Sequence, residues 1–186
     1  EIGVRVGFFK PLSQSIHNME DHSIHFARAI NHIETPEAIH ISEAQVFISR
    51  GDKDLLMEKI SANFHQVKQH YDVIIIEGIV PTQDQAYSAE LNKDIANSLD
   101  AEIILLAPIS SLSTPYTAEK LEKHIHTAMG TFGSVKKNII GCILNKISVI
   151  DQKDPNGNGL HISENPIPNL IQLNADNTNL EFINNC

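Results

Sequence analysis

The segment Val73-Ile74-Ile75-Ile76-Glu77-Gly78 decides the fold class. Its four consecutive large, β-branched residues favour a β-strand, and an apolar run without polar alternation is typical of a strand covered on both faces, as in a parallel sheet. A carboxylate and a glycine follow at once, so we expect the chain to leave the sheet there. Three further apolar, strand-like runs occur along the chain, at residues 4–9, 101–107 and 138–144.

Segments with helical periodicity lie between these runs. The clearest covers residues 52–70, where apolar side chains recur at intervals of three and four, namely Leu55, Leu56, Ile60, Phe64 and Val67. Weaker helical patterns cover residues 21–33, 85–99 and 114–129, and Asp21 is placed to cap the first of these helices. Strands that alternate with helices predict right-handed crossovers and a parallel sheet flanked by helices, which is an α/β fold.

The composition is that of a globular domain with a core. The chain has 186 residues, of which 41% are hydrophobic and 20% charged. Acidic residues outnumber basic ones by 23 to 14, and the formal net charge of -9 opposes non-specific binding to nucleic acid or to an anionic membrane. We therefore expect neither partner. No apolar run approaches the roughly 20 residues of a membrane-spanning helix, and we expect no secretory leader.

The two cysteines indicate a reducing compartment. Cys142 lies inside an apolar run and Cys186 is the last residue, so we predict neither a disulfide framework nor a cysteine metal site. This usage fits the cytoplasm. The ten histidines have no cysteine partners and no zinc-protease spacing, so exposed helix positions are their simpler interpretation.

A change of composition after Ile150 sets the predicted domain boundary. We predict that residues 1–150 form the α/β domain. Residues 151–159 are rich in Asp, Asn, Gly and Pro, which is typical of a flexible loop. Residues 151–186 are therefore predicted to be a loop and a terminal segment that leads to a further domain, with one short strand at residues 167–171.

Polar residues at the ends of the strands are the candidates for ligand binding, because parallel sheets bind ligands in the crevice beyond the carboxyl ends. Glu77 could hold Mg²⁺ beside phosphates or cap the next turn. Lys10 could contact a phosphate or be a solvated lysine. Asn145 could read a purine edge or turn the chain. Asp21 is a further candidate metal ligand, although the N-cap is the commoner role.

Glycine-rich phosphate-binding motifs do not occur in the sequence. Neither G-x-x-x-x-G-K-[ST] nor G-x-G-x-x-G is found. The sequence runs from Glu1 directly into a strand, whereas a strand, a glycine-rich loop and a helix ahead of it would need roughly 30 residues. The serines at positions 110, 111 and 113 lack a G-x-S-x-G elbow, so no catalytic residue is predicted.

These segments resemble the N-terminal, dethiobiotin-synthetase-like domain of the long bacterial phosphate acetyltransferases. The resemblance spans residues 3–147 and rests on residues 3–12, 52–60, 73–82, 91–96 and 141–146. The Glu-Gly-x-Val-Pro-Thr stretch at residues 77–82 and the Leu-Asn pair at residues 91–92 are specific to this family. Lys10-Pro11 and the strand-end Glu77 are shared with dethiobiotin and cobyrinate synthetases.

The resemblance implies a P-loop-type α/β domain of the dethiobiotin synthetase kind, whose first strand, phosphate loop and first helix are absent from this chain. It implies that ATP or another nucleotide binds with Mg²⁺. Lys10 and Asn145 would then contact the nucleotide, with Asn145 at the base, and Glu77 and Asp21 would hold the metal.

The resemblance also implies the function. In this family a separate C-terminal acetyltransferase domain binds coenzyme A and interconverts acetyl-CoA and phosphate with coenzyme A and acetyl phosphate. The N-terminal domain regulates it and stabilises a homo-oligomer. We therefore expect a non-catalytic domain that binds a nucleotide or another small-molecule effector. The alternatives are an ATP- and Mg²⁺-dependent ligase like the dethiobiotin or cobyrinate synthetases, and a purely structural domain.

Overall fold

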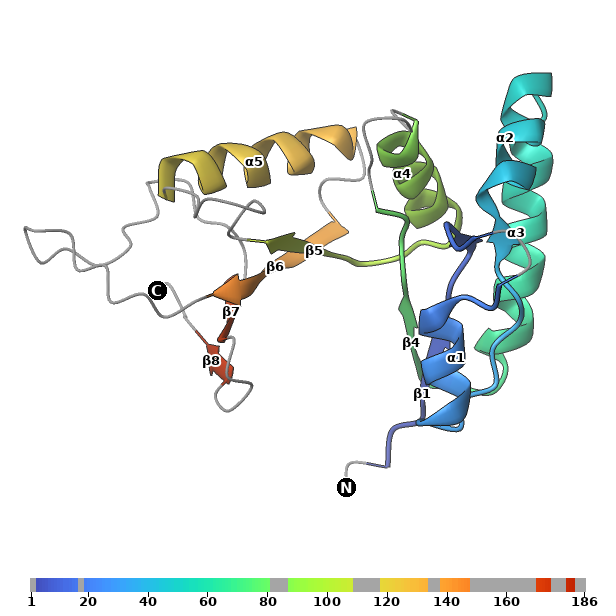
Figure 1. The fold of residues 1–186 in the computed structure, drawn as a ribbon, viewed down its shortest axis with the longest axis horizontal. Helices are drawn as coiled ribbons and strands as arrows, with labels where there is room; N and C mark the ends of the chain where they lie inside the picture. The colour runs from blue at the N-terminus through green and yellow to red at the C-terminus, as the bar shows by residue number, and fades with distance from the viewer. Residues whose placement is uncertain are drawn as a thin grey trace, which may run out of the picture. The chain divides into compact units, whose positions relative to one another are not determined.

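The computed structural model describes residues 3–16, 19–80, 87–108, 118–133, 138–147, 170–174 and 180–182. The chain forms two compact units, residues 1–100 and residues 101–186 (Figure 1). Both units combine parallel strands with helices, as the alternating sequence pattern predicts. The α/β class is thereby confirmed.

The described residues of the first unit form two short parallel pairs of strands. β1 (Val6–Phe9) pairs with β4 (Val73–Ile76), and β2 (Leu12–Ser13) pairs with β3 (Ile39–His40). Pro11 separates β1 from β2, because proline has no N–H to donate to the ladder. Since β1 and β4 are parallel, their carboxyl ends lie at the same edge.

The described part of the first unit contains the helices α1 (His22–Ala29), α2 (Ile41–Arg50), α3 (Lys53–Lys68) and α4 (Ser88–Ser98). α3 confirms the helix predicted over residues 52–70. α1 is shorter than the predicted residues 21–33, because the chain leaves the helix at Ile30 and His32 has a positive φ of 53°. Asp21 caps α1 as predicted, since its carboxylate accepts from the Ser23 N–H.

The sequence pattern does not predict α2. Its N-cap is His40, whose ring nitrogen accepts from the Ser42 N–H in place of the usual serine or aspartate oxygen. α2 ends at Gly51, which has a φ of 79° and adopts the left-handed conformation that glycine favours.

The core of the first unit lies where β1 and β2 meet α2, α3 and α4. Phe9 is 1% exposed, and its ring centroid lies 5.6 Å from that of Phe64 on α3. The buried residues of α3 are Leu56, Ile60, Phe64 and Val67. The prediction that Leu55 shares this stripe is wrong, because Leu55 is 53% exposed and lies about 100° around the helix from Leu56.

The other face of the β1–β4 pair is open among the described residues of the first unit. Val73 is 50% exposed and Ile75 is 58% exposed, and Val6 opposite Val73 is also exposed. The run at residues 73–76 is therefore a strand, as predicted, but burial on both faces is not observed. α2, α3 and α4 contribute side chains to the core that contains Phe9.

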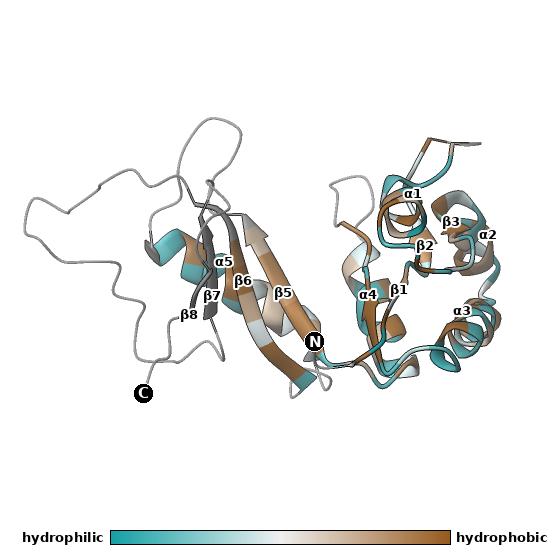
Figure 2. Cartoon of the chain, turned by 90° about the horizontal axis from the view of Figure 1, so that it is seen from below, coloured by the Kyte–Doolittle hydropathy of each residue, from teal (hydrophilic) through white to brown (hydrophobic). Residues whose placement is uncertain are grey.

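The second unit contains a four-stranded sheet of the order β5-β6-β7-β8. Its strands are β5 (Ile103–Pro108), β6 (Ile139–Ile147), β7 (Leu170–Asn174) and β8 (Leu180–Phe182). β5, β6 and β7 are parallel, whereas β8 runs antiparallel to β7, which departs from the purely parallel sheet that the sequence predicts. β5 and β6 are hydrophobic over most of their length (Figure 2).

Helix α5 (Ala118–Thr131) accompanies this sheet and buries Leu121, Ile125 and Met129 at helical spacing. Cys142 on β6 is 1% exposed, and burial raises the pKa of its thiol to about 11. The short strand predicted at residues 167–171 corresponds to β7, but residues 167–169 and the loop predicted at residues 151–159 lie outside the described residues. None of the helices in the described ranges combines the length and the apolar character that crossing a bilayer requires.

Candidate functional site

Lys10 and Glu77 leave neighbouring strands at the same edge of the first unit. Lys10 follows β1 directly and Glu77 follows β4 directly. The N–H of Glu77 donates to the carbonyl of Phe9 over 2.9 Å, which extends the ladder by one bond beyond β4. The Lys10 ammonium donates to Oε1 of Glu77 over 2.6 Å. The two strand ends thus bring a cation and a carboxylate into contact.

Asp21 joins this pair from the start of α1. Its Oδ1 accepts from the Ser23 N–H over 3.0 Å and lies 3.0 Å from the Lys10 ammonium nitrogen. Its Oδ2 accepts from the hydroxyl of Ser13 over 2.6 Å. Asp21 is therefore both a helix cap and an ion-pair partner, and both its carboxylate oxygens are engaged.

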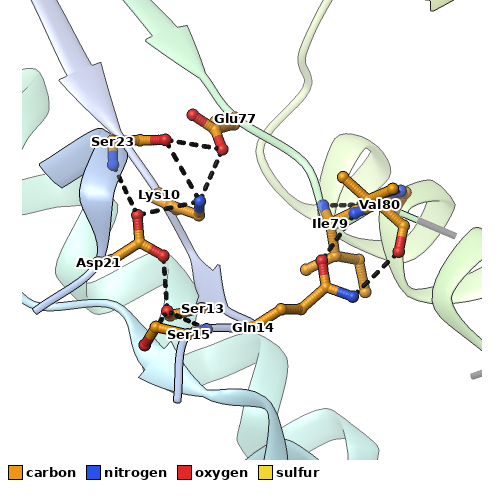
Figure 3. A network of polar contacts seen from close by, with 10 residues as sticks. Lys10, Ser13, Gln14, Ser15, Asp21, Ser23, Glu77, Ile79 and Val80 are labelled. Atoms are coloured by element: carbon orange, nitrogen blue, oxygen red, sulfur yellow. Dashed lines mark hydrogen bonds and ion pairs between the residues drawn. The ribbon is translucent and has the colours of Figure 1, made fainter. Parts of the chain in front are cut away.

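Two serines connect the charged groups (Figure 3). The Ser23 hydroxyl donates to Oε1 of Glu77 over 3.1 Å and accepts from the Lys10 ammonium over 3.5 Å. Ser13, at the end of β2, links Asp21 to the hydroxyl of Ser15. Neither serine is among the site residues predicted from the sequence. One sequence signal points to the position of Ser23. It lies two residues after the predicted N-cap Asp21, where an N-cap side chain accepts a bond from the backbone N–H.

The cluster formed by Lys10, Asp21 and Glu77 carries a net negative charge and is partly buried. The side chains of Lys10 and Asp21 are 12% and 8% exposed, whereas that of Glu77 is 38% exposed. Two carboxylates face one ammonium, so one negative charge is left uncompensated within the cluster. Glu77 is the member that solvent and ligands reach.

Ion pairing outweighs burial in setting the charge states of the cluster. Burial lowers the pKa of Lys10, but hydrogen bonds to Glu77 and Asp21 outweigh it, so the net pKa is raised. Burial raises the pKa of Asp21, but hydrogen bonds from Ser13 and Lys10 outweigh it, so the net pKa is lowered. Both groups are therefore held charged near neutral pH.

The donor set of the cluster fits a hard cation such as Mg²⁺. The interactions found for Glu77 all involve Oε1, and within the described residues Oε2 has no partner. A carboxylate oxygen is a preferred ligand of Mg²⁺. In the described ranges no group of three or more His, Cys, Asp and Glu side chains is arranged to hold a metal. Phosphate oxygens and water are the ligands that Mg²⁺ usually combines with one or two carboxylates.

The structure brings three of the four predicted site residues together and leaves the fourth in the other unit. Lys10, Asp21 and Glu77 belong to residues 1–100. Asn145 belongs to the second unit, where it lies on β6 opposite Pro108 of β5. The prediction that Asn145 contacts the base of a nucleotide stays a prediction.

Comparisons with known proteins place the chain in a family. It matches the family model of the AAA domain over residues 1–175. It is similar to the phosphate acetyltransferase of Haemophilus influenzae, with 32% identity over 149 residues, and to that of Escherichia coli, with 35% identity over 150 residues. Each match covers 78% of this chain and 20% of the relative. The chain thus spans about a fifth of the length of the curated relatives it matches.

Proposed function

Because the chain belongs to the AAA domain family, we propose that it is an N-terminal regulatory domain of a phosphate acetyltransferase and that it binds a nucleotide with Mg²⁺. The similarity to phosphate acetyltransferases supports the first part. The whole protein would convert acetyl-CoA and phosphate into coenzyme A and acetyl phosphate, or the reverse, in the cytoplasm. Coenzyme A would bind in a C-terminal acetyltransferase domain, and no catalytic residue is assigned to this chain.

The charged cluster at the carboxyl ends of β1 and β4 is the observation that carries the ligand proposal. Ligands of open parallel sheets bind beyond these ends. Glu77 would ligate Mg²⁺ through Oε2, which is not engaged by any described residue. Lys10 would attract the phosphates, and Asp21 would hold the Lys10 side chain in place. Bound Mg²⁺ would neutralise phosphate charge and the uncompensated charge of the cluster.

Calorimetric titration tests the ligand proposal. ATP is titrated into the full-length protein with and without Mg²⁺, beside the variants Glu77→Gln and Glu58→Gln. Glu58 is an exposed glutamate on α3 and serves as the matched control. We expect Mg²⁺-dependent binding in the wild type and in Glu58→Gln, and its loss in Glu77→Gln. If millimolar nucleotide gives no heat of binding, the proposal is contradicted. Lys10 would then serve only to join β1, α1 and β4 through its ion pairs with Asp21 and Glu77.

Enzyme assays separate a regulatory domain from a ligase-like enzyme. We expect ATP to change the rate of acetyl phosphate formation in the wild type and not in Glu77→Gln. We expect the protein not to release phosphate from ATP. Phosphate release that Glu77→Gln abolishes would contradict the regulatory proposal and favour an ATP-dependent ligase of the dethiobiotin or cobyrinate synthetase kind.

We also propose that the protein is a homo-oligomer to which this domain contributes. The open apolar face of the β1–β4 pair supports this, because contiguous exposed apolar surface is typical of interaction sites. Sedimentation velocity of the full-length protein tests it. A monomer at micromolar concentration would contradict it.

A further inference from the structure

The backbone that follows Glu77 is held by two side-chain amides. The ladder between β1 and β4 ends with the bond from the Glu77 N–H to the Phe9 carbonyl. Beyond it the chain has left the sheet, so its backbone groups need other partners. Ile79 and Val80 each find one amide side chain that bonds both their N–H and their carbonyl.

Asn92 on α4 supplies the first amide. The Ile79 N–H donates to Oδ1 of Asn92 over 2.9 Å, and Nδ2 of Asn92 donates to the Ile79 carbonyl over 2.8 Å. The Asn92 side chain lies close to the backbone of Gly78, since a Cβ added to Gly78 would lie only 2.9 Å from Oδ1 of Asn92. The Ile79 side chain is 4% exposed and belongs to the core. Asn92 and the core therefore fix this residue from both sides.

Gln14, just after β2, supplies the second amide. The Val80 N–H donates to Oε1 of Gln14 over 2.8 Å, and Nε2 of Gln14 donates to the Val80 carbonyl over 3.0 Å. The side chain of Gln14 extends from the backbone beside Ser13 and Ser15 toward Ile79 and Val80 (Figure 3). Gln14 thereby ties the end of the Glu77 segment to the chain that carries Lys10.

We propose that Asn92 and Gln14, which we call the clamp, are positioning residues that aim the Glu77 carboxylate at Lys10 and at bound Mg²⁺. The claim that the two amides orient Glu77 toward Mg²⁺ rests on the proposed function, whereas the claim that they orient it toward Lys10 does not. Glu77 makes the last bond of the ladder and is only three residues from Val80, so a rotation of the backbone at Gly78 that frays this end would swing its carboxylate away from Lys10. Glycine is the residue that permits such rotation most readily. The two amides prevent it by fixing the chain immediately after Gly78.

The test compares Asn92→Ala and Gln14→Ala with Asn97→Ala and Gln66→Ala in the full-length protein. Asn97 is exposed on α4, the helix that also carries Asn92, and Gln66 is exposed on α3, so both controls match in residue type. Exchange of the Ile79 amide should rise about tenfold in Asn92→Ala, and that of Val80 in Gln14→Ala, as loss of one hydrogen bond implies. Thermal melts identify any variant that does not fold, and the other clamp variant then carries the test.

Two readouts separate positioning from mere structural support. Exchange of the Lys10 ammonium protons with water, followed by NMR of its side chain, should become faster in both clamp variants because its bond to Glu77 is lost part of the time. The affinity for Mg²⁺ with ATP should weaken about tenfold, and neither readout should change in the controls. If both match the wild type while the amides exchange faster, the inference is wrong. If the wild type binds no ATP, the proposed function fails and the exchange rate of the Lys10 ammonium protons decides the inference.

Discussion

Lys10 donates to two carboxylates that come from different elements, Asp21 at the start of α1 and Glu77 at the end of β4. The Lys10 side chain is nearly buried, so removal of either carboxylate leaves the ammonium with one fewer ion-pair partner, and water can only partly solvate it. The remaining carboxylate would be expected to keep Lys10 charged. The contribution of each partner can be separated by substitution.

We expect Asp21→Ala to lower the free energy of unfolding by roughly 3 kcal/mol, because it removes both an ion-pair partner of Lys10 and the cap of α1. Asp54→Ala is the control, since Asp54 is exposed in the first turn of α3 and loses only a helix-dipole interaction of about 0.5 kcal/mol. Urea denaturation measures both. Equal losses in the two variants would contradict a special role for Asp21.

A second ion pair gives a prediction for pH dependence. Hydrogen bonds from the Arg5 side chain and backbone lower the pKa of Asp72 to about 2, compared with a usual value of 3.8. Because the folded pKa is depressed, this pair stabilises the fold fully above the usual value, and its contribution is lost as the pH falls toward 2. NMR titration of the Asp72 carboxyl carbon should show its pKa return toward 3.8 in Arg5→Gln. An identical titration in wild type and variant would rule out the pair in solution.

Charged candidates were predictable from the sequence, and their neutral partners were not. Lys10 and Glu77 can be found because each follows an apolar run, and parallel strands place their ends together. Ser13, Ser23 and the amides of the clamp have no such marker. A single hydroxyl or amide has no spacing pattern, and its partners are set by how α1 and α4 pack.

At the level of elements, length and the cap residue decide how well a helix can be predicted. α3 packs one stripe into the core and shows clear periodicity, so the sequence predicts it to within two residues at each end. α2 is capped by a histidine, and among its residues only Ile41 and Ala44 are fully buried. The apolar residues at positions 41, 44, 47 and 48 have helical spacing, but a histidine is not one of the residues that mark a helix start, so the sequence reading misses this helix.

The stripe of α3 gives a prediction with an internal control. Leu56 is fully buried, whereas its neighbour Leu55 is 53% exposed. We expect Leu56→Ala to cost about 3 kcal/mol, because it removes buried methyl groups and leaves a cavity. We expect Leu55→Ala to cost less than about 1 kcal/mol. Urea denaturation of both variants checks this, and a larger loss for Leu55→Ala would show that the helix is rotated.

For the whole molecule, the sequence predicts which strands are apolar but not what covers them. An apolar run indicates burial whatever element supplies it, so the exposed faces at Val73 and Ile75 could not be foreseen. Ile104 and Leu106 on β5 are likewise exposed. That a first strand, a phosphate loop and a first helix precede the described strands in the parent protein stays a prediction.

Locating the bound cation tests the central claim most directly. Mn²⁺ accepts the same oxygen ligands as Mg²⁺ and broadens the NMR signals of nearby nuclei. With Mn²⁺ and ATP, we predict broadening of the amide signals of Lys10, Ser23 and Gly78 in the wild type, and its loss in Glu77→Gln. No broadening at these residues, or the same broadening in Glu77→Gln, would contradict a nucleotide-metal site at this edge of the sheet.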